Sequence, residues 1–144
     1  MQAKRLGFND VIDTSQEKLG DGVRRITNGH GADIVIDGIG GDVLSEALGA
    51  LASGGSIISL GYSASRKATI DVTNLIVPQA GIRGLNMFAQ PKTAVSDAWK
   101  VIIGLLKSGA IKPIVAKTFP LAEAPEALRY LIEDRPFGRV VLTI

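Results

Sequence analysis

Glycines gather directly after a carboxylate in the stretch ADIVIDGIGGD, residues 32–42. A run of β-branched residues ends at Asp37, and Gly38, Gly40 and Gly41 follow before a helical pattern begins. Glycines at such a strand-to-helix turn let a ribose or phosphate approach the backbone, and the helix behind them offers free N–H groups. The pattern predicts either a nucleotide-binding turn or a tight turn that serves the fold alone, and both interpretations stay open.

The turn fails the tests for three known nucleotide-binding motifs. Counted from Gly38, the dinucleotide motif Gly-x-Gly-x-x-Gly places Val43 where glycine or alanine is needed, and the next apolar run, residues 56–60, ends without the acid that binds a ribose. A methyltransferase-like turn would need glycine at the position of Ile39. A Gly-Lys-Ser/Thr phosphate loop is absent from the sequence. This stretch is therefore not the first turn of a dinucleotide-binding unit.

Strand and helix patterns alternate around the turn. The unalternating β-branched run at 34–36 predicts a strand buried on both faces. Helical spacing predicts a helix that Asp42 caps and that Gly54-Gly55 ends. The order favours an α/β fold with a parallel sheet. Further strands are expected at 11–12, 56–60, 81–88, 113–119 and 139–144, and further helices at about 16–27, 91–109 and from Pro125, with a short apolar piece at 75–77.

Composition narrows the function classes. The chain has 144 residues, 46% hydrophobic and 21% charged, with 16 basic and 14 acidic residues for a net charge of +2. We read this as a soluble, cytoplasmic protein with a real core, without a membrane span or signal peptide and without a basic footprint for nucleic acid. With no cysteine and one histidine, His30, no metal site is expected.

Several single residues have a structural interpretation beside a functional one. Asp37 is interpreted as a cap of the following turn rather than a base, and His30 as an exposed loop residue. Trp99 lies on the apolar stripe of the helix at 91–109, which predicts a core position. Arg66 and Lys67 are read as a solvated loop, with a phosphate contact as the alternative.

Four segments taken together resemble the C-terminal part of the medium-chain dehydrogenase/reductases. They are LGFNDVIDTSQEK, NGHGADIVIDGIGGD, LASGGSIISLGY and FGRVVL, in the family's order and with similar spacing over nearly the whole chain. The Asp-x-x-Gly-Gly form at 37–41 is most similar to the zinc-independent, NADPH-dependent quinone oxidoreductase branch. The resemblance implies hydride transfer from NADPH to a quinone or an activated alkene.

The resemblance also implies a fold and an organisation. It implies a partial Rossmann-type parallel sheet with flanking helices that lacks the first two strands of the order 3-2-1-4-5-6. Residues 1–109 would be the C-terminal part of the cofactor-binding domain, and 110–144 a tail that returns to the catalytic lobe in the family. The chain would then be a fragment, inactive alone and a weak NADPH binder at best. Exposed sheet edges would favour a homo-oligomer, such as a dimer.

Site residues follow from the same resemblance. The turn would line the adenosine or ribose side of the cofactor groove, the end of the fifth family strand would approach the cofactor with its backbone, and the end of the sixth would face the nicotinamide amide. These three sets are Gly38, Ile39, Gly40 and Gly41; Leu60, Gly61 and Tyr62; and Asn86, Met87 and Phe88. No catalytic residue is assigned, and the partner in the parent enzyme would be a small-molecule substrate.

Other functions stay open beside this one. The chain could be a non-catalytic module that assembles through its sheet edges. It could be a fragment of a zinc-dependent alcohol dehydrogenase. A methyltransferase-like variant is disfavoured by Ile39.

Overall fold

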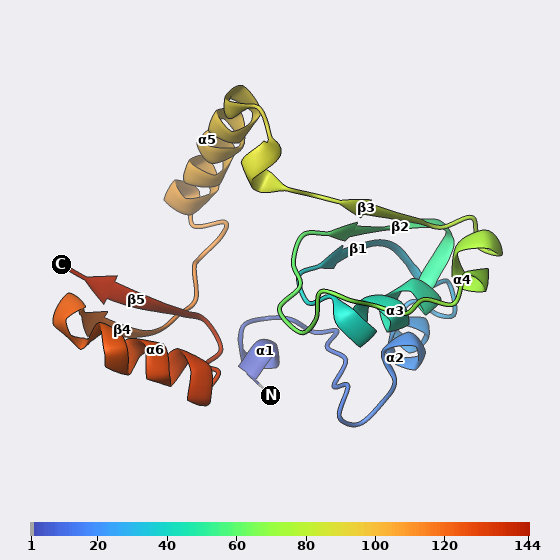
Figure 1. Cartoon of the computed structure of the whole chain (residues 1–144), viewed down its shortest axis with the longest axis horizontal. Helices are drawn as coiled ribbons and strands as arrows, with labels where there is room; N and C mark the ends of the chain where they lie inside the picture. Colours follow the sequence, from blue (N-terminus) through green and yellow to red (C-terminus); the bar gives the residue numbers. More distant parts are fainter. Residues whose placement is uncertain (1) are drawn as a thin grey trace. The chain divides into compact units, whose positions relative to one another are not determined.

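The computed structural model describes residues 2–144, which divide into two units at residues 89 and 90 (Figure 1). Both units are of the α/β type, as the sequence predicts. The first contains α1 (Gln2–Arg5), α2 (Leu19–Ile26), β1 (Ala32–Asp37), α3 (Gly41–Gly49), β2 (Leu51–Ser59), α4 (Thr73–Ile76), β3 (Gly81–Gly84) and the 3-10 helix η1 (Met87–Ala89). The second contains α5 (Lys92–Ser108), β4 (Val115–Pro120), the 3-10 helix η2 (Leu121–Glu123), α6 (Ala124–Glu133) and β5 (Arg139–Thr143).

A parallel three-stranded sheet forms the centre of the first unit. Its strand order is β1-β2-β3, and Ile57 of β2 pairs with Val35 of β1 and Ile82 of β3. Each crossover contains a helix, α3 in the first and α4 in the second. The predicted parallel sheet with flanking helices is therefore confirmed, and it brings the carboxyl ends of all three strands to one edge.

The core of the first unit lies between this sheet and α3. Ala47, Leu48, Leu51 and Ile57 form its buried cluster, with Leu48 and Ile57 almost completely shielded from solvent. Leu44, Ala47 and Leu48 recur at helical spacing, so one face of α3 is apolar and packs on β2. Burial of this face holds the start of α3 at the carboxyl edge of the sheet.

The prediction that the strand at 34–36 is buried on both faces was wrong. Val35 packs against the core, but Ile34 is 71% exposed and Ile36 64%. Figure 1 shows α2 and α3 on the same side of the sheet. A β-branched run cannot reveal that only one face is covered, because it fits a pleated strand on either face.

Two glycines belong to a strand rather than to the end of a helix. The predicted helix end at Gly54-Gly55 was wrong, because α3 ends at Gly49 and β2 begins at Leu51. The register with β1 shifts between Ala32 and Ile34, and an added Cβ on Gly55 would lie 2.7 Å from the Ala32 oxygen. Glycine is therefore needed where the two backbones come together at this bulge.

The predicted strand at 11–12 was also wrong, because residues 11–13 form no regular element. Ile12 instead packs against α2. A Cβ added to Gly22 would lie 2.6 to 2.9 Å from three carbons of the Ile12 side chain. The glycine that weakens α2 as a helix thus provides the space in which Ile12 docks.

The remaining predicted elements were found with changed boundaries. The helix at 16–27 is shorter, at Leu19–Ile26, and the apolar piece at 75–77 lies largely in α4. The strand at 81–88 stops at Gly84, and its last residues enter η1. The cap of α3 is Gly40 and not Asp42, because Gly40 adopts φ 71° and the helix begins at Gly41.

The second unit is a β4-α6-β5 motif preceded by α5. Its two strands are parallel, and Phe119 and Ala127 are buried between sheet and helix. Phe119 and Tyr130 place their ring centroids 5.8 Å apart, and the Lys117 ammonium lies over both rings. Trp99 of α5 is 55% exposed, so the predicted core position was wrong within the described chain. The family-based domain boundary at 109/110 stays a prediction.

None of the helices within residues 2–144 combines the length and the apolar character that a membrane crossing requires.

Candidate functional site

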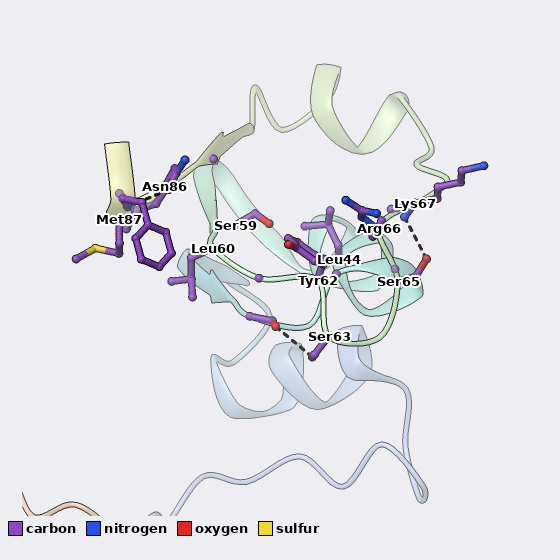
Figure 2. A pocket seen from close by; sticks show the side chains of 18 residues that line it. Leu44, Ser59, Leu60, Tyr62, Ser63, Ser65, Arg66, Lys67, Asn86 and Met87 are labelled. Atoms are coloured by element: carbon purple, nitrogen blue, oxygen red, sulfur yellow. Dashed lines mark hydrogen bonds between the residues drawn. The ribbon is translucent and has the colours of Figure 1, made fainter. Parts of the chain in front are cut away.

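A pocket opens at the carboxyl edge of the sheet in the first unit. Its volume is about 1300 Å³, above the roughly 300–1,000 Å³ common for small-molecule sites. It is lined from the ends of all three strands, by residues 38–41, 59–68 and 84–88 in part, and by Leu44 of α3 (Figure 2). The carboxyl edge is where open α/β sheets bind ligands.

The pocket brings together nine of the ten residues assigned from the resemblance. They are Gly38, Gly40, Gly41, Leu60, Gly61, Tyr62, Asn86, Met87 and Phe88. Ile39 is not among the lining residues. The roles of all ten toward a cofactor remain predictions.

Asp37 organises the turn from behind the pocket. Its carboxyl group is buried, and Oδ1 accepts hydrogen bonds from the backbone N–H groups of Ile39 at 2.9 Å and Gly40 at 3.1 Å. Oδ2 accepts a third from the Ser59 hydroxyl at 3.2 Å. The prediction that Asp37 caps the turn is confirmed. Two N–H groups of the kind that bind a phosphate at a glycine turn are therefore already occupied.

Two of the glycines allow the turn to pack on the loop after β2. A Cβ on Gly61 would lie 2.5 Å from the Gly38 oxygen, and one on Gly40, at φ 71°, would lie 2.7 Å from the Ser65 oxygen. Ala64 N donates to the Ile39 oxygen at 2.9 Å. Gly40 and Gly61 are therefore needed for contact between two chain segments, which supports the structural interpretation of these positions.

Two other glycines leave backbone open to a ligand. A Cβ on Gly38 would meet only the Leu60 Cδ1 at 3.9 Å, and one on Gly84 would meet nothing within 4 Å. Both residues line the pocket and neither has a positive φ. A ligand can therefore approach the backbone closely at these two points.

The chemistry of the lining is apolar and cationic. Leu60, Leu85, Met87 and Phe88 supply exposed apolar surface at the strand ends. Arg66 and Lys67 are the cations, and none of the described lining residues is Asp or Glu. Such a lining suits a ligand with a flat apolar part and an anionic part.

Arg66 stacks on an aromatic ring at the pocket. Its Cζ lies 5.6 Å from the ring centroid of Tyr62, whose side chain is largely exposed. Sequence analysis placed Arg66 and Lys67 on a solvated loop and set the phosphate contact second. Only the fold shows that residues 61–65 dock on the glycine turn and bring Arg66 to the pocket.

The side chains of the described residues do not form a metal-binding site. The described residues contain no group of three or more His, Cys, Asp or Glu that could hold an ion. His30 is exposed, as expected, and its Nε2 lies 2.9 Å from Asp33 Oδ1.

Comparisons with known proteins agree on one family. The family model described as zinc-binding dehydrogenase matches residues 6–142. A 2-haloacrylate reductase from Burkholderia sp. is 31% identical over 97% of this chain, and a quinone oxidoreductase-like protein 2 homolog from Nematostella vectensis is 27% identical over 96%. The crystal structure of a 2-haloacrylate reductase superposes with a TM-score of 0.84 at 30% identity.

The match covers only part of each relative. The chain spans 43% and 39% of the two curated relatives, and 45% of the 2-haloacrylate reductase structure while 99% of this chain is covered.

Proposed function

Because the chain belongs to the zinc-binding dehydrogenase family, among the medium-chain dehydrogenase/reductases, we propose that it forms one wall of a nicotinamide cofactor cleft. The enzyme would transfer hydride from NADPH to a quinone or an activated alkene. The names of two relatives, a 2-haloacrylate reductase and a quinone oxidoreductase-like protein, support this substrate class. The cofactor supplies the hydride, and the protein binds and orients it.

The pocket at the carboxyl edge is the observation that carries the proposal. The open backbone at Gly38 would accept the adenosine or ribose side, together with Gly40 and Gly41. The last residues of β2 and the loop after it, with Tyr62, would lie along the cofactor. Residues 86–88 would face the nicotinamide amide.

No metal ligand is assigned to the residues of this chain. The sequence has no cysteine and a single histidine, and the described residues offer no cluster of metal ligands. We therefore assign to the groups of this chain only the binding and positioning of the cofactor, and we assign no acid or base to them. We propose NADPH rather than NADH only because the sequence resembles the quinone oxidoreductase branch.

Titration with nucleotide, followed residue by residue by NMR, tests the proposal. NADPH should shift the amide signals of 38–41, 60–62 and 86–88, with a dissociation constant in the millimolar range because the chain alone holds the cofactor weakly. Gly38→Ala should weaken binding several-fold, since its methyl group projects into open pocket space.

Gly20→Ala is the matched control. A Cβ added to Gly20 would have no atom within 4 Å, and Gly20, like Gly38, has no positive φ, but it lies on α2 outside the pocket lining. Equal affinities of the two variants, or shifts that avoid the pocket, would contradict the proposed cleft. A micromolar constant for the wild type would contradict weak binding by the chain alone.

A second candidate function is self-association. Among the described residues β1 pairs with β2 only, which leaves its other edge open, and Ile34 and Ile36 are exposed on its face. An open edge beside apolar side chains favours pairing with another copy. Light scattering should then show mass rising with concentration, and Ile34→Asp should abolish the rise. A monomer at every concentration would remove this candidate.

A further inference from the structure

We propose that Arg66 forms an anion subsite at the pocket, which binds a phosphate of the cofactor or a carboxylate of the substrate. The inference deepens the proposed function, because it concerns the same pocket. It assigns a role to a side chain that no resemblance assigns, and it names the chemistry that the site selects: a planar or tetrahedral oxyanion attached to the ligand.

The position of Arg66 follows from how its loop is fastened. Ala64 N donates to the Ile39 oxygen, Ser65 forms a parallel bridge with Gly40, and the Ser63 hydroxyl donates to the Gly38 oxygen at 3.2 Å. These contacts hold the residues just before Arg66 on the glycine turn. The base of the side chain is therefore fixed beside the pocket.

The guanidinium group is oriented but not neutralised. It lies over the Tyr62 ring, 5.6 Å from the centroid, and Figure 2 shows the two side chains together at the pocket. No carboxylate pairs with it among the described residues, in contrast to Arg25, which pairs with Glu17. A guanidinium stacked on a ring keeps its edge N–H groups available for a bidentate contact with an oxyanion.

The charges around the pocket favour an anion at this place. The described lining contains no acid, and the N–H groups of Ile39 and Gly40 are already bonded to Asp37. These two N–H groups of the glycine turn are therefore not free for an incoming anion. A side-chain cation at the pocket adds attraction of the kind that backbone N–H groups provide at an open nucleotide-binding turn.

Lys67 provides an internal control. It lines the same pocket and carries the same charge, but Figure 2 shows its side chain extending away from Arg66 and Tyr62. Its backbone N donates to the Ser65 hydroxyl at 3.1 Å. Loss of one positive charge on the loop is thus matched between the two variants, whereas loss of the stacked guanidinium is specific to Arg66.

The test measures binding of four probes to the wild type, Arg66→Ala and Lys67→Ala by NMR. Inorganic phosphate and acrylate probe the anion subsite without a nicotinamide group, and NADH and NADPH probe the cofactor. Arg66→Ala should weaken at least one probe about tenfold, as for a lost charge-assisted contact, whereas Lys67→Ala, which removes the other cation of the lining, should cause a smaller loss of affinity for the same probe. Arg66→Lys should restore only part of the affinity.

The pattern of losses identifies the source of the anion. A loss for phosphate and both nucleotides assigns the cofactor's diphosphate, and a loss confined to NADPH among the nucleotides assigns its extra phosphate. A loss for acrylate alone assigns the substrate carboxylate. Equal effects of Arg66→Ala and Lys67→Ala, or no binding of phosphate and acrylate at any concentration, would overturn the subsite. If phosphate or acrylate bound but neither NADH nor NADPH did, the result would instead count against the proposed cofactor cleft.

Discussion

The packing of Gly61 on the glycine turn allows a sharp prediction about stability. In Gly61→Ala the new methyl carbon would lie 2.5 Å from the oxygen, 2.9 Å from the carbon and 3.0 Å from the Cα of Gly38. All three are backbone atoms, so no side-chain rotation relieves the overlap. The loop after β2 has to move away from the turn.

The cost of that movement follows from the contacts it disturbs. Overpacking costs about 1–3 kcal/mol. The shift also strains the hydrogen bond from Ala64 N to the Ile39 oxygen and that from the Ser63 hydroxyl to the Gly38 oxygen, each worth about 1 kcal/mol. We expect Gly61→Ala to lower the free energy of unfolding by about 3 kcal/mol.

Urea unfolding followed by far-UV circular dichroism measures this loss, with Gly38→Ala as the matched variant on the other side of the contact. Gly38→Ala meets only the Leu60 Cδ1 at 3.9 Å, so its stability should rise by up to about 0.5 kcal/mol through the stiffer unfolded chain. If the two variants were equally stable, the close approach of loop and turn would not be a determinant of the fold, and the reasoning would fail.

Three further changes test other contacts by urea unfolding. Asp37→Ala removes a buried acceptor of three hydrogen bonds and should cost about 2–3 kcal/mol; a loss below about 0.5 kcal/mol would contradict its capping role. Gly22→Ala should lower the free energy of unfolding by about 1–2 kcal/mol through contact with Ile12. In a double-mutant cycle, the same change should cost little in the Ile12→Ala background, where the contact is absent. The hydrogen bond from Arg25 holds the pKa of Glu17 below its ordinary value, so their stabilisation is complete above that ordinary value and is lost as the pH falls through the lowered pKa. Glu17→Gln should therefore reduce the loss of stability on acidification. If the free energy of unfolding of the variant fell with pH as steeply as that of the wild type, the contribution of the Glu17–Arg25 pair would be refuted.

Sequence reasoning located the elements that follow from periodicity. The stripe on α3 and the caps of α5, from Pro91 to Gly109, were readable because helical spacing and end signals agree there. The same reasoning failed at Gly54-Gly55, where the residues that end a helix also permit a bulge in a strand. Local sequence cannot separate these uses, because the distinction lies in the neighbouring strand.

Burial was the least predictable property. Ile34, Ile36 and Trp99 are residue types that are usually shielded, yet each is more than half exposed in the described chain. Their sequence patterns predicted buried positions. Whether such a side chain is covered depends on elements that do not adjoin it in the sequence, and no local pattern contains that information.

The candidate site was predictable in part. The glycine turn and the strand ends could be named because parallel strands deliver their carboxyl ends to one edge. Arg66 was set aside because a basic residue on a polar loop is usually solvated. Its place beside Tyr62 depends on the docking of residues 61–65 on the turn, which only the three-dimensional contacts reveal.

The uniformly parallel pairing of the described strands also bears on how quickly the chain folds. Ile34 meets Ser56 and Val115 meets Arg139, so each sheet forms only after about twenty intervening residues close a loop. No two-residue hairpin is present within these strand pairs to nucleate a sheet early. Each crossover has to close before its strands can pair, and folding should be slower than that of a helical bundle of the same size.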